Sequence, residues 1–127
     1  MKQRIETDKS PKAIGPYSQG IIQGNFIFTA GQIHLTTNGE LLGGSLEDKM
    51  NQVMRNLEEI LKAVGVTFAE VVKTTVYVTN MSKSNLERIN KIYMEYMKEP
   101  YPARETVCVK QLPKGAEIEI SMIAFKV

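Results

Sequence analysis

Residues 102–122, PARETVCVKQLPKGAEIEISM, constrain the fold of this chain more than any other stretch. They hold two runs in which polar and apolar residues alternate, 103–110 and 117–123, and the turn-like segment LPKGA of residues 112–116 joins the runs. Alternation with a period of two is typical of a β-strand with one buried face. The stretch therefore predicts two strands near the C-terminal end of the chain.

The alternation also divides the side chains of these runs between two faces. One set is apolar: Val107, Val109, Ile118, Ile120 and Met122. The opposite set is mostly polar: Arg104, Thr106, Cys108, Glu117, Glu119 and Ser121. If the apolar residues share one core, Arg104 meets two glutamates on the other face. Such a face is either a site for an anion and a water molecule or a solvated surface with ion pairs, and surface ion pairs are common.

Length and composition describe one domain, residues 1–127, with 43% hydrophobic and 24% charged residues. The net charge of +2 is too small to indicate a nucleic-acid partner, which normally requires a concentrated basic patch. No apolar run approaches the roughly 18 residues of a membrane span, and the N-terminus lacks the apolar core of a secretory signal. A single cysteine, Cys108, suits a reducing compartment, so we expect a cytoplasmic protein.

The residue inventory also restricts the chemistry. One histidine, His34, and one cysteine cannot form a zinc site of the usual spacing. The chain has neither a Walker loop nor the G-x-G-x-x-G pattern of dinucleotide-binding proteins. We therefore expect neither a metal nor a cofactor. His34 itself is expected at a strand end or in a loop.

The rest of the chain predicts four more strands and two helices. The strand-like runs are 2–6, 18–23, 26–32 and 69–79, and Gly24-Asn25 forms a tight-turn pair between two of them. The strand over 69–79 is expected to turn Val72, Thr74, Val76 and Val78 to one face. The first helix follows Ser45, which with Asp48 resembles a capping box, and it stops at Gly65.

The second helix is expected to begin near residues 82–84, with Ser84 and Glu87 in capping-box spacing, and to end before Pro100. The resulting order is β-β-β-α-β-α-β-β, an α+β fold in which two helices pack on one face of a six-stranded mixed sheet. In the runs 21–22 and 26–28, the residues that point to either face of the sheet are apolar. The face without helices therefore needs a further layer to cover it. A homo-oligomer that packs sheet against sheet would supply it.

Several blocks of this sequence resemble the RidA family (YjgF, L-PSP endoribonuclease-like) over nearly the whole chain. They are AIGPYSQG (13–20), TAGQI (29–33), VKTTVYV (72–78), Asn90-x-x-Tyr93, PAR (102–104), LPK (112–114) and IEI (118–120). The resemblance implies a chorismate-mutase-like fold and a homotrimer with ligand clefts between subunits. It also implies hydrolysis of reactive enamine and imine acids, such as 2-aminoacrylate, to 2-oxo acids and ammonia without a cofactor.

The resemblance further implies roles for individual residues. Arg104 matches the arginine that binds the substrate carboxylate, and Glu119 matches the acid that positions the attacking water. The implied cleft-lining positions are Tyr17, Ala30 and Gly31 from the neighbouring subunit, together with Asn90 and Thr106. The chain departs from the usual pattern at three of its residues: Ala30, Glu105 and Thr106. By alternation Glu105 falls on the Val107 face, but its charge beside Arg104 bears on substrate range.

Two other functions remain open at this stage. One is an endoribonuclease or translation inhibitor, although the chain lacks a basic run and an aromatic stacking platform. The other is a non-enzymatic trimer that binds 2-oxo acids or acts as a chaperone. Residues expected to have only structural roles are Glu117 on the surface, Cys108 as a small buried residue, and Met50, Met54, Met94 and Met97 in the core.

Overall fold

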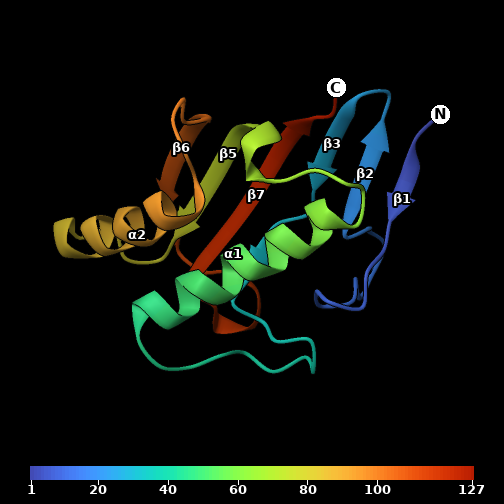
Figure 1. Ribbon diagram of the computed structural model, residues 1–127. Coiled ribbons are helices and arrows are strands. Elements are labelled where there is room, and N and C mark those ends of the chain that lie inside the picture. Colours follow the sequence, from blue (N-terminus) through green and yellow to red (C-terminus); the bar gives the residue numbers. More distant parts are fainter.

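A computed structural model describes residues 1–127 and shows one sheet with two α-helices (Figure 1). The strands are β1 (Gln3–Ile5), β2 (Gly20–Gln23), β3 (Phe26–Thr29), β4 (Gln32–Ile33), β5 (Val71–Val78), β6 (Ala103–Cys108) and β7 (Ile118–Phe125). The helices are α1 (Leu46–Lys62) and α2 (Lys83–Tyr96), and two short 3-10 helices cover η1 (Phe68–Glu70) and η2 (Pro113–Gly115). No helix is both long and apolar enough to cross a membrane.

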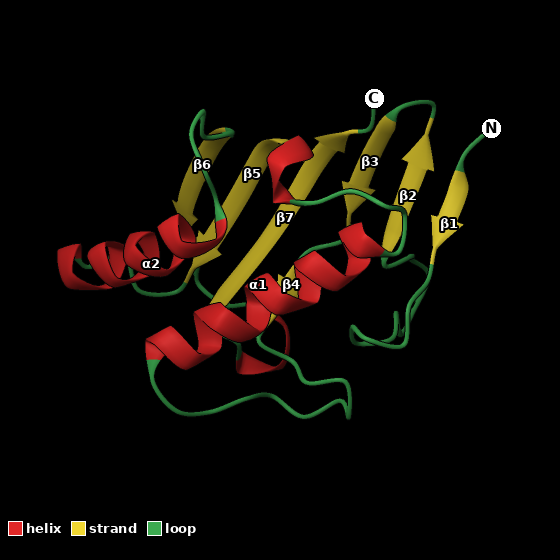
Figure 2. Ribbon diagram, in the orientation of Figure 1, coloured by secondary structure: helices red, strands yellow, loops and turns green.

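The sheet is mixed, with the strand order β1-β2-β3-β7-β5-β6, and only β5 and β6 run parallel. Both helices cover the same face of the sheet, as the α+β prediction required (Figure 2). The sheet has seven strands because the predicted run 26–32 divides at Ala30-Gly31 into β3 and β4. Both of these strands pair with β7, so the interruption is a local excursion of the chain beside β7.

The core lies between the helices and the sheet. Helix α1 begins at the predicted capping box, in which the Ser45 hydroxyl accepts the amide N–H of Asp48 at 3.0 Å. The apolar stripe of α1 is fully enclosed and packs on alternate residues of β5 and β7. The prediction for β5 is wrong at one end, because a bulge between Val71 and Lys73 buries Val71 and leaves Val72 47% exposed.

Helix α2 starts earlier than the capping-box spacing indicates. Its N-cap is Ser82, whose hydroxyl accepts the amide N–H of Asn85 at 3.1 Å, so Ser84 lies inside the first turn. Met97 is buried as expected, but Met94 is 54% exposed, and the prediction of a core role for Met94 is wrong. Residue 94 follows the buried Tyr93 directly and therefore points away from the stripe that faces the sheet.

The face of the sheet opposite the helices carries exposed apolar side chains. The largest are Phe26, Phe28, Val107 and Phe125. The ring of Phe26 lies 5.1 Å from that of Phe125, edge to face, and 6.2 Å from that of Phe28. The predicted two-sided apolar character of the sheet is therefore present, with one side open in the single chain.

His34 ties the start of β7 to the segment after β4. It is 1% exposed; its Nδ1 lies 2.8 Å from the carbonyl of Leu42, and its Nε2 accepts the amide N–H of Glu117 at 3.0 Å. This pair of contacts requires a neutral ring with the proton on Nδ1. The predicted place at a strand end is correct, and burial adds a structural role.

Burial lowers the pKa of His34 from its ordinary value of about 6.5. On acidification, His34 therefore binds a proton at a higher pH in the unfolded chain than in the folded chain. The free energy of unfolding is highest above pH 6.5 and decreases as the pH drops through the pKa of His34 in the folded chain. We expect urea unfolding at pH 8, 7, 6 and 5 to show this loss. The variant His34→Gln, measured in parallel, should lose less stability over the same range, and an unchanged pH dependence would contradict the assignment.

Candidate functional site

The chain forms two separate candidate half-sites, and the first surrounds Arg104. A cleft of about 280 Å³ lies between α2 and the start of β6, lined by Asn90, Tyr93, Met94, Tyr101, Pro102 and Arg104. The guanidinium carbon of Arg104 lies 5.0 Å from the centre of the Tyr93 ring. Arg104 forms no ion pair within the chain, so its donors remain free for an anion.

Tyr93 is the support for this arginine. Its hydroxyl donates to the Thr74 hydroxyl at 3.0 Å, and burial raises the pKa of Tyr93, which keeps the phenol protonated. A fixed ring beneath a planar guanidinium restricts its orientation and adds a cation–π attraction. From the sequence, Tyr93 has no predicted site role beyond its place in the block Asn90-x-x-Tyr93. Its spacing of three residues from Asn90 was the available signal that it also faces the cleft.

Asn90 reaches the same cleft from one turn earlier in α2. Its Oδ1 is the one enclosed side-chain nitrogen or oxygen without a hydrogen-bond partner in this chain. An enclosed acceptor without a partner costs about 1–3 kcal/mol. A polar group held at such a cost beside a free guanidinium is more typical of a binding cleft than of a packing position.

The predicted meeting of Arg104 with two glutamates on one face is wrong. Residue 104 pairs with Thr74 of β5, and Thr74 pairs with Met122 of β7, so Arg104 lies on the helix face of the sheet. Alternation places Glu119 on the opposite face. The error arises at β6, an edge strand whose apolar residue Val107 is 40% exposed and whose polar residues face α2.

The other residues of β6 are accounted for by this geometry. Glu105 points away from Arg104, as alternation predicted, and its carboxylate binds the ammonium of Lys73 at 2.8 Å. This contact lowers the pKa of Glu105. Thr106 is half-buried on the face of Arg104 but lines neither cleft in the chain. Cys108 is exposed, so the prediction that it is buried is wrong, because nothing covers the end of this edge strand.

The second half-site surrounds Glu119. A cleft of about 530 Å³ is bounded by the loop before β2, by residues 30–33, by η2 and by β7. It brings together four residues predicted for the ligand cleft: Tyr17, Ala30, Gly31 and Glu119. Lys12 and Lys114 line it as well, and sequence reasoning did not single them out. Tyr17 is 55% exposed, with its hydroxyl 3.3 Å from the amide nitrogen of Ile14, which donates to it.

Gly31 packs directly on the carboxyl group of Glu119. A Cβ added at residue 31 would lie 2.8 Å from Cδ of Glu119, closer than carbon atoms approach in proteins. A side chain at residue 31 would therefore require the carboxyl group of Glu119 to move. Burial raises the pKa of Glu119 above its ordinary value of about 4.5, so this carboxyl takes up a proton more readily than an exposed one.

Glu117, two residues earlier, has a different environment. Its carboxylate pairs with the ammonium of Lys49 in α1, and it is exposed. The expected surface role for Glu117 agrees with this contact.

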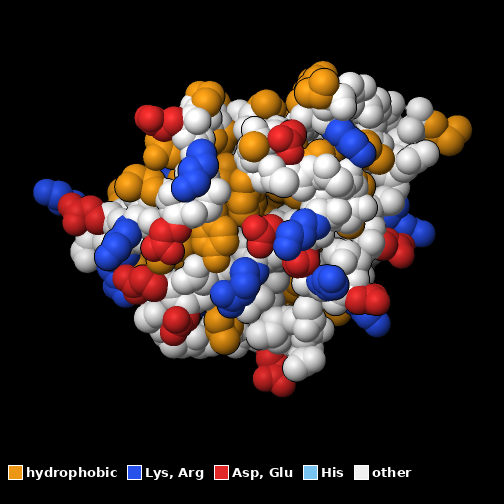
Figure 3. Space-filling view, viewed as in Figure 1, with side chains coloured by type: hydrophobic (Ala, Val, Ile, Leu, Met, Phe, Trp, Pro, Cys, Tyr) orange, Lys and Arg blue, Asp and Glu red, His pale blue; other side chains and the backbone are white.

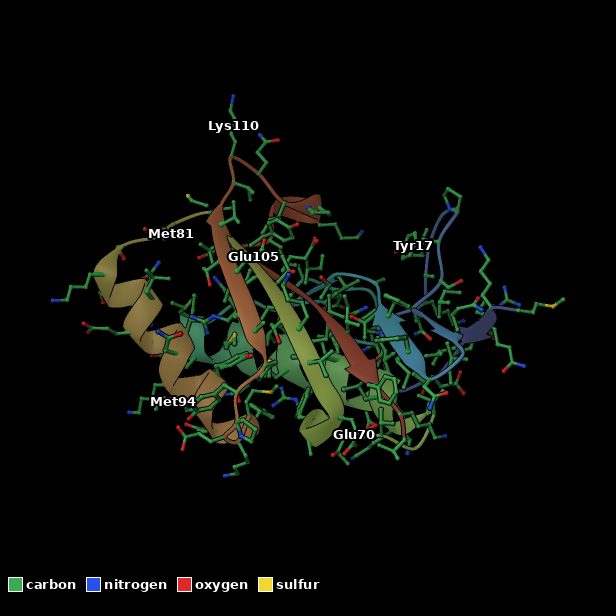
Figure 4. The ribbon with its side chains drawn as sticks, turned by 90° about the horizontal axis from the view of Figure 1, so that it is seen from above. Tyr17, Glu70, Met81, Met94, Glu105 and Lys110 are labelled. Atoms are coloured by element: carbon green, nitrogen blue, oxygen red, sulfur yellow. The ribbon has the colours of Figure 1, made fainter.

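The two clefts have no residue in common and open in different places. Met94 of the Arg104 cleft and Tyr17 of the Glu119 cleft lie at opposite ends of the molecule (Figure 4). One half-site holds an unpaired guanidinium without an acid, and the other holds a half-buried acid with an exposed tyrosine.

Comparisons with known proteins agree on one family. Residues 7–126 match the family described as Endoribonuclease L-PSP. The chain is 45% identical over 127 residues to a RutC family protein of Pyrococcus horikoshii, with 99% of each chain covered. It is 42% identical over 123 residues to the human 2-iminobutanoate/2-iminopropanoate deaminase, which covers 96% of this chain and 88% of the human protein.

Solved structures give the same result for the fold. A Thermotoga maritima protein described as a candidate endoribonuclease superposes with a TM-score of 0.95 at 47% identity, covering 100% of this chain and 99% of that one. Escherichia coli TdcF with bound serine superposes with a TM-score of 0.90 at 33% identity, covering 98% and 99%. The fold, the matching profile and these identities over nearly the full length show that the chain belongs to the RidA (L-PSP endoribonuclease-like) family.

Proposed function

We propose that this protein hydrolyses 2-imino acids, the tautomers of enamines such as 2-aminoacrylate, to 2-oxo acids and ammonia. The observation that carries the proposal is Arg104, a half-buried guanidinium that is stacked on Tyr93 and has no carboxylate partner in its own chain. A guanidinium binds a carboxylate through two parallel hydrogen bonds and so fixes its orientation. The human relative is named a deaminase of this substrate class, and TdcF binds serine, which carries the same carboxylate.

Glu119 supplies the water and proton chemistry in this proposal. The overall reaction is R–C(=NH₂⁺)–COO⁻ + H₂O → R–C(=O)–COO⁻ + NH₄⁺. The ionised Glu119 orients water and accepts one of its protons as oxygen bonds to the imine carbon, and the protonated acid then delivers that proton to the amine. Glu119 next accepts the proton of the new hydroxyl as the C–N bond breaks and C=O forms, and it passes this second proton to the departing ammonia, which leaves as NH₄⁺. Its raised pKa suits a group that must hold and release a proton within one cycle.

We also propose that the two half-sites form one cleft between copies of the chain in a homotrimer. The half-sites lie on opposite faces of the sheet in one chain, so a single copy cannot bring Arg104 to Glu119. The exposed phenylalanine face offers apolar surface for packing sheet against sheet. In such a cleft Tyr17, Ala30 and Gly31 from one copy close over the carboxylate held by Arg104 and Asn90 of its neighbour, and Thr106 borders it.

A mixing experiment tests the shared cleft. Arg104→Met and Glu119→Gln should each have very low activity at a substrate concentration below the wild-type KM, but subunits of the two variants, unfolded and refolded together, should recover activity there. Random assembly gives each cleft an intact Arg104 with a chance of one half and an intact Glu119 with the same chance, so about a quarter of wild-type activity is expected. No recovery in mixed oligomers of confirmed composition would contradict a cleft that is shared between copies.

The substrate proposal is tested by ammonia release from 2-aminoacrylate generated enzymatically from serine. Turnover above the spontaneous rate supports the deaminase, and binding of 2-oxobutanoate without turnover would support the non-enzymatic reading instead. We propose a cytoplasmic location for this reaction, because a reducing compartment suits the free, exposed Cys108 thiol.

The endoribonuclease reading has less support from the site. The single histidine is buried and uses both ring nitrogens in structural contacts. Basic and acidic side chains are interspersed over the helix face (Figure 3). RNA cleavage that is lost on neutralising Lys12 and Lys114 would restore that reading.

A further inference from the structure

The loop that carries Tyr17 is held from inside by one buried amide. Gln19 is buried, with only 5% of its surface exposed to solvent. Its Oε1 accepts the amide N–H of Thr7 at 2.8 Å, and its Nε2 lies 2.8 Å from the carbonyl of Pro11, 3.1 Å from that of Thr7 and 3.3 Å from that of Ser10. One side chain therefore joins both ends of the loop 7–19, which has no regular secondary structure before β2.

The same loop is fastened to α1 and to the chain after β4. The hydroxyl of Ser10, which is 2% exposed, donates to the carbonyl of Asn56 in α1. Asn56 is also buried, with 1% of its surface exposed. Its side-chain amide donates to the carbonyls of Ile33 at 3.2 Å and Leu35 at 2.9 Å. The Glu119 cleft is lined by residues of the loop and of the chain at and after β4, including Pro11, Ile33 and Leu35.

The backbone of Gln19 completes the connection to the carboxyl group. Its carbonyl accepts the amide N–H of Ala30 at 2.9 Å, and the next residue, Gly31, packs on Glu119. Hydrogen bonds of Gln19 thus connect the Tyr17 loop to Ala30, and the next residue, Gly31, contacts the carboxyl group of Glu119. The amide donors of Gln19 and Asn56 are engaged within the protein, so neither is free to donate a hydrogen bond to a substrate.

We infer that Gln19 is a positioning residue for catalysis, which, with Ser10 and Asn56, holds the Tyr17 loop and Gly31 against Glu119 and limits the access of bulk solvent to the carboxyl group. The inference rests on the proposed deaminase function for its kinetic effect, but its structural effect can be measured without turnover. Because Arg104 lies in the other half-site, loosening this network should impair the handling of water and protons more than the binding of the carboxylate.

Gln19→Met tests the inference, because it keeps the length of the side chain and removes its four hydrogen bonds. We expect kcat to fall by about 10- to 100-fold with a smaller change in KM, as for small misplacements of catalytic groups. Burial raises the pKa of Glu119, so admission of water should move its titration to lower pH. Carbon-13 NMR of glutamate carboxyl groups, assigned with Glu119→Gln, measures that shift without any substrate.

Ser10→Ala is the milder second variant, since it removes only the bond to Asn56, and it should shift both readouts in the same direction by less. Ser82→Ala is the control: it removes the cap of α2 and lowers thermal stability, but it should leave the titration of Glu119 unchanged. A wild-type titration and wild-type kcat in both Gln19→Met and Ser10→Ala would overturn the inference. A shifted titration in a protein that hydrolyses no imine would support the positioning role and overturn the proposed function.

Discussion

Replacing Arg104 by methionine is expected to lower kcat/KM for 2-imino acids by about 10²- to 10³-fold, mainly by raising KM. Methionine retains an unbranched apolar side chain over the Tyr93 ring but removes the guanidinium. Loss of one member of a desolvated, hydrogen-bonded charge pair costs on the order of 2–5 kcal/mol, which corresponds to this range. The measurement is steady-state ammonia release over a range of substrate concentrations.

Two further variants separate charge from geometry. Arg104→Lys keeps the charge but not the planar fork, so its kcat/KM should lie between those of the wild type and Arg104→Met. Arg88→Met is the control, because Arg88 donates two hydrogen bonds to Glu47 on the helix side, outside both clefts. Its activity should equal that of the wild type. A wild-type KM in Arg104→Met would contradict the anchoring role.

The sequence predicted the elements of the fold because their signals are local. The capping box at Ser45, the apolar stripe of α1 and the turn at Gly24 depend on residues a few positions apart. The start of α2 falls within the predicted residues 82–84, but the cap is Ser82 and not Ser84. Both serines offer capping hydroxyls, and only the backbone conformation decides between them.

The faces of β6 could not be predicted from alternation, which gives relative but not absolute orientation. An edge strand is covered on few sides, so the rule that apolar residues face the core is weakest there. Val107 is exposed, and Arg104 lies beneath α2 on the Tyr93 ring. The exposure of Cys108, which was predicted to be buried, has the same cause, because Cys108 lies at the end of this edge strand.

The assignment of residues to two half-sites also required coordinates. The resemblance assigned Tyr17, Ala30 and Gly31 to the neighbouring subunit, but it did not separate Glu119 from Arg104. In one chain Glu119 lies with Tyr17, Ala30 and Gly31 in one cleft, and Arg104 lies in another. Within the chain the Glu105 carboxylate is paired with Lys73 on the face away from Arg104, so it does not line the Arg104 cleft.

Glu119→Gln is expected to lower kcat by about 10²- to 10⁴-fold, the usual contribution of a general acid–base group, with little change in KM. Glutamine keeps the size of the side chain but cannot accept and return a proton at this step. Because burial raises the pKa of Glu119, wild-type kcat/KM should fall on acidification at a higher pH than an exposed glutamate would cause. That acid limb should be absent from the residual activity of the variant, and its persistence would assign it to another group.

Gly31→Ala tests the same carboxyl group through its neighbour, without changing its chemistry. The backbone of Gly31 does not adopt a positive φ, so the cost of alanine comes from the contact of its Cβ with the carboxyl group of Glu119. The carboxyl group must move, and kcat should fall by about 10²-fold, as for other displacements near 1 Å. Gly43→Ala is the matched control, since its Cβ would meet no atom within 4 Å. If Gly31→Ala retains the full kcat, then either Glu119 tolerates displacement or the water is activated elsewhere, and both outcomes contradict the mechanism.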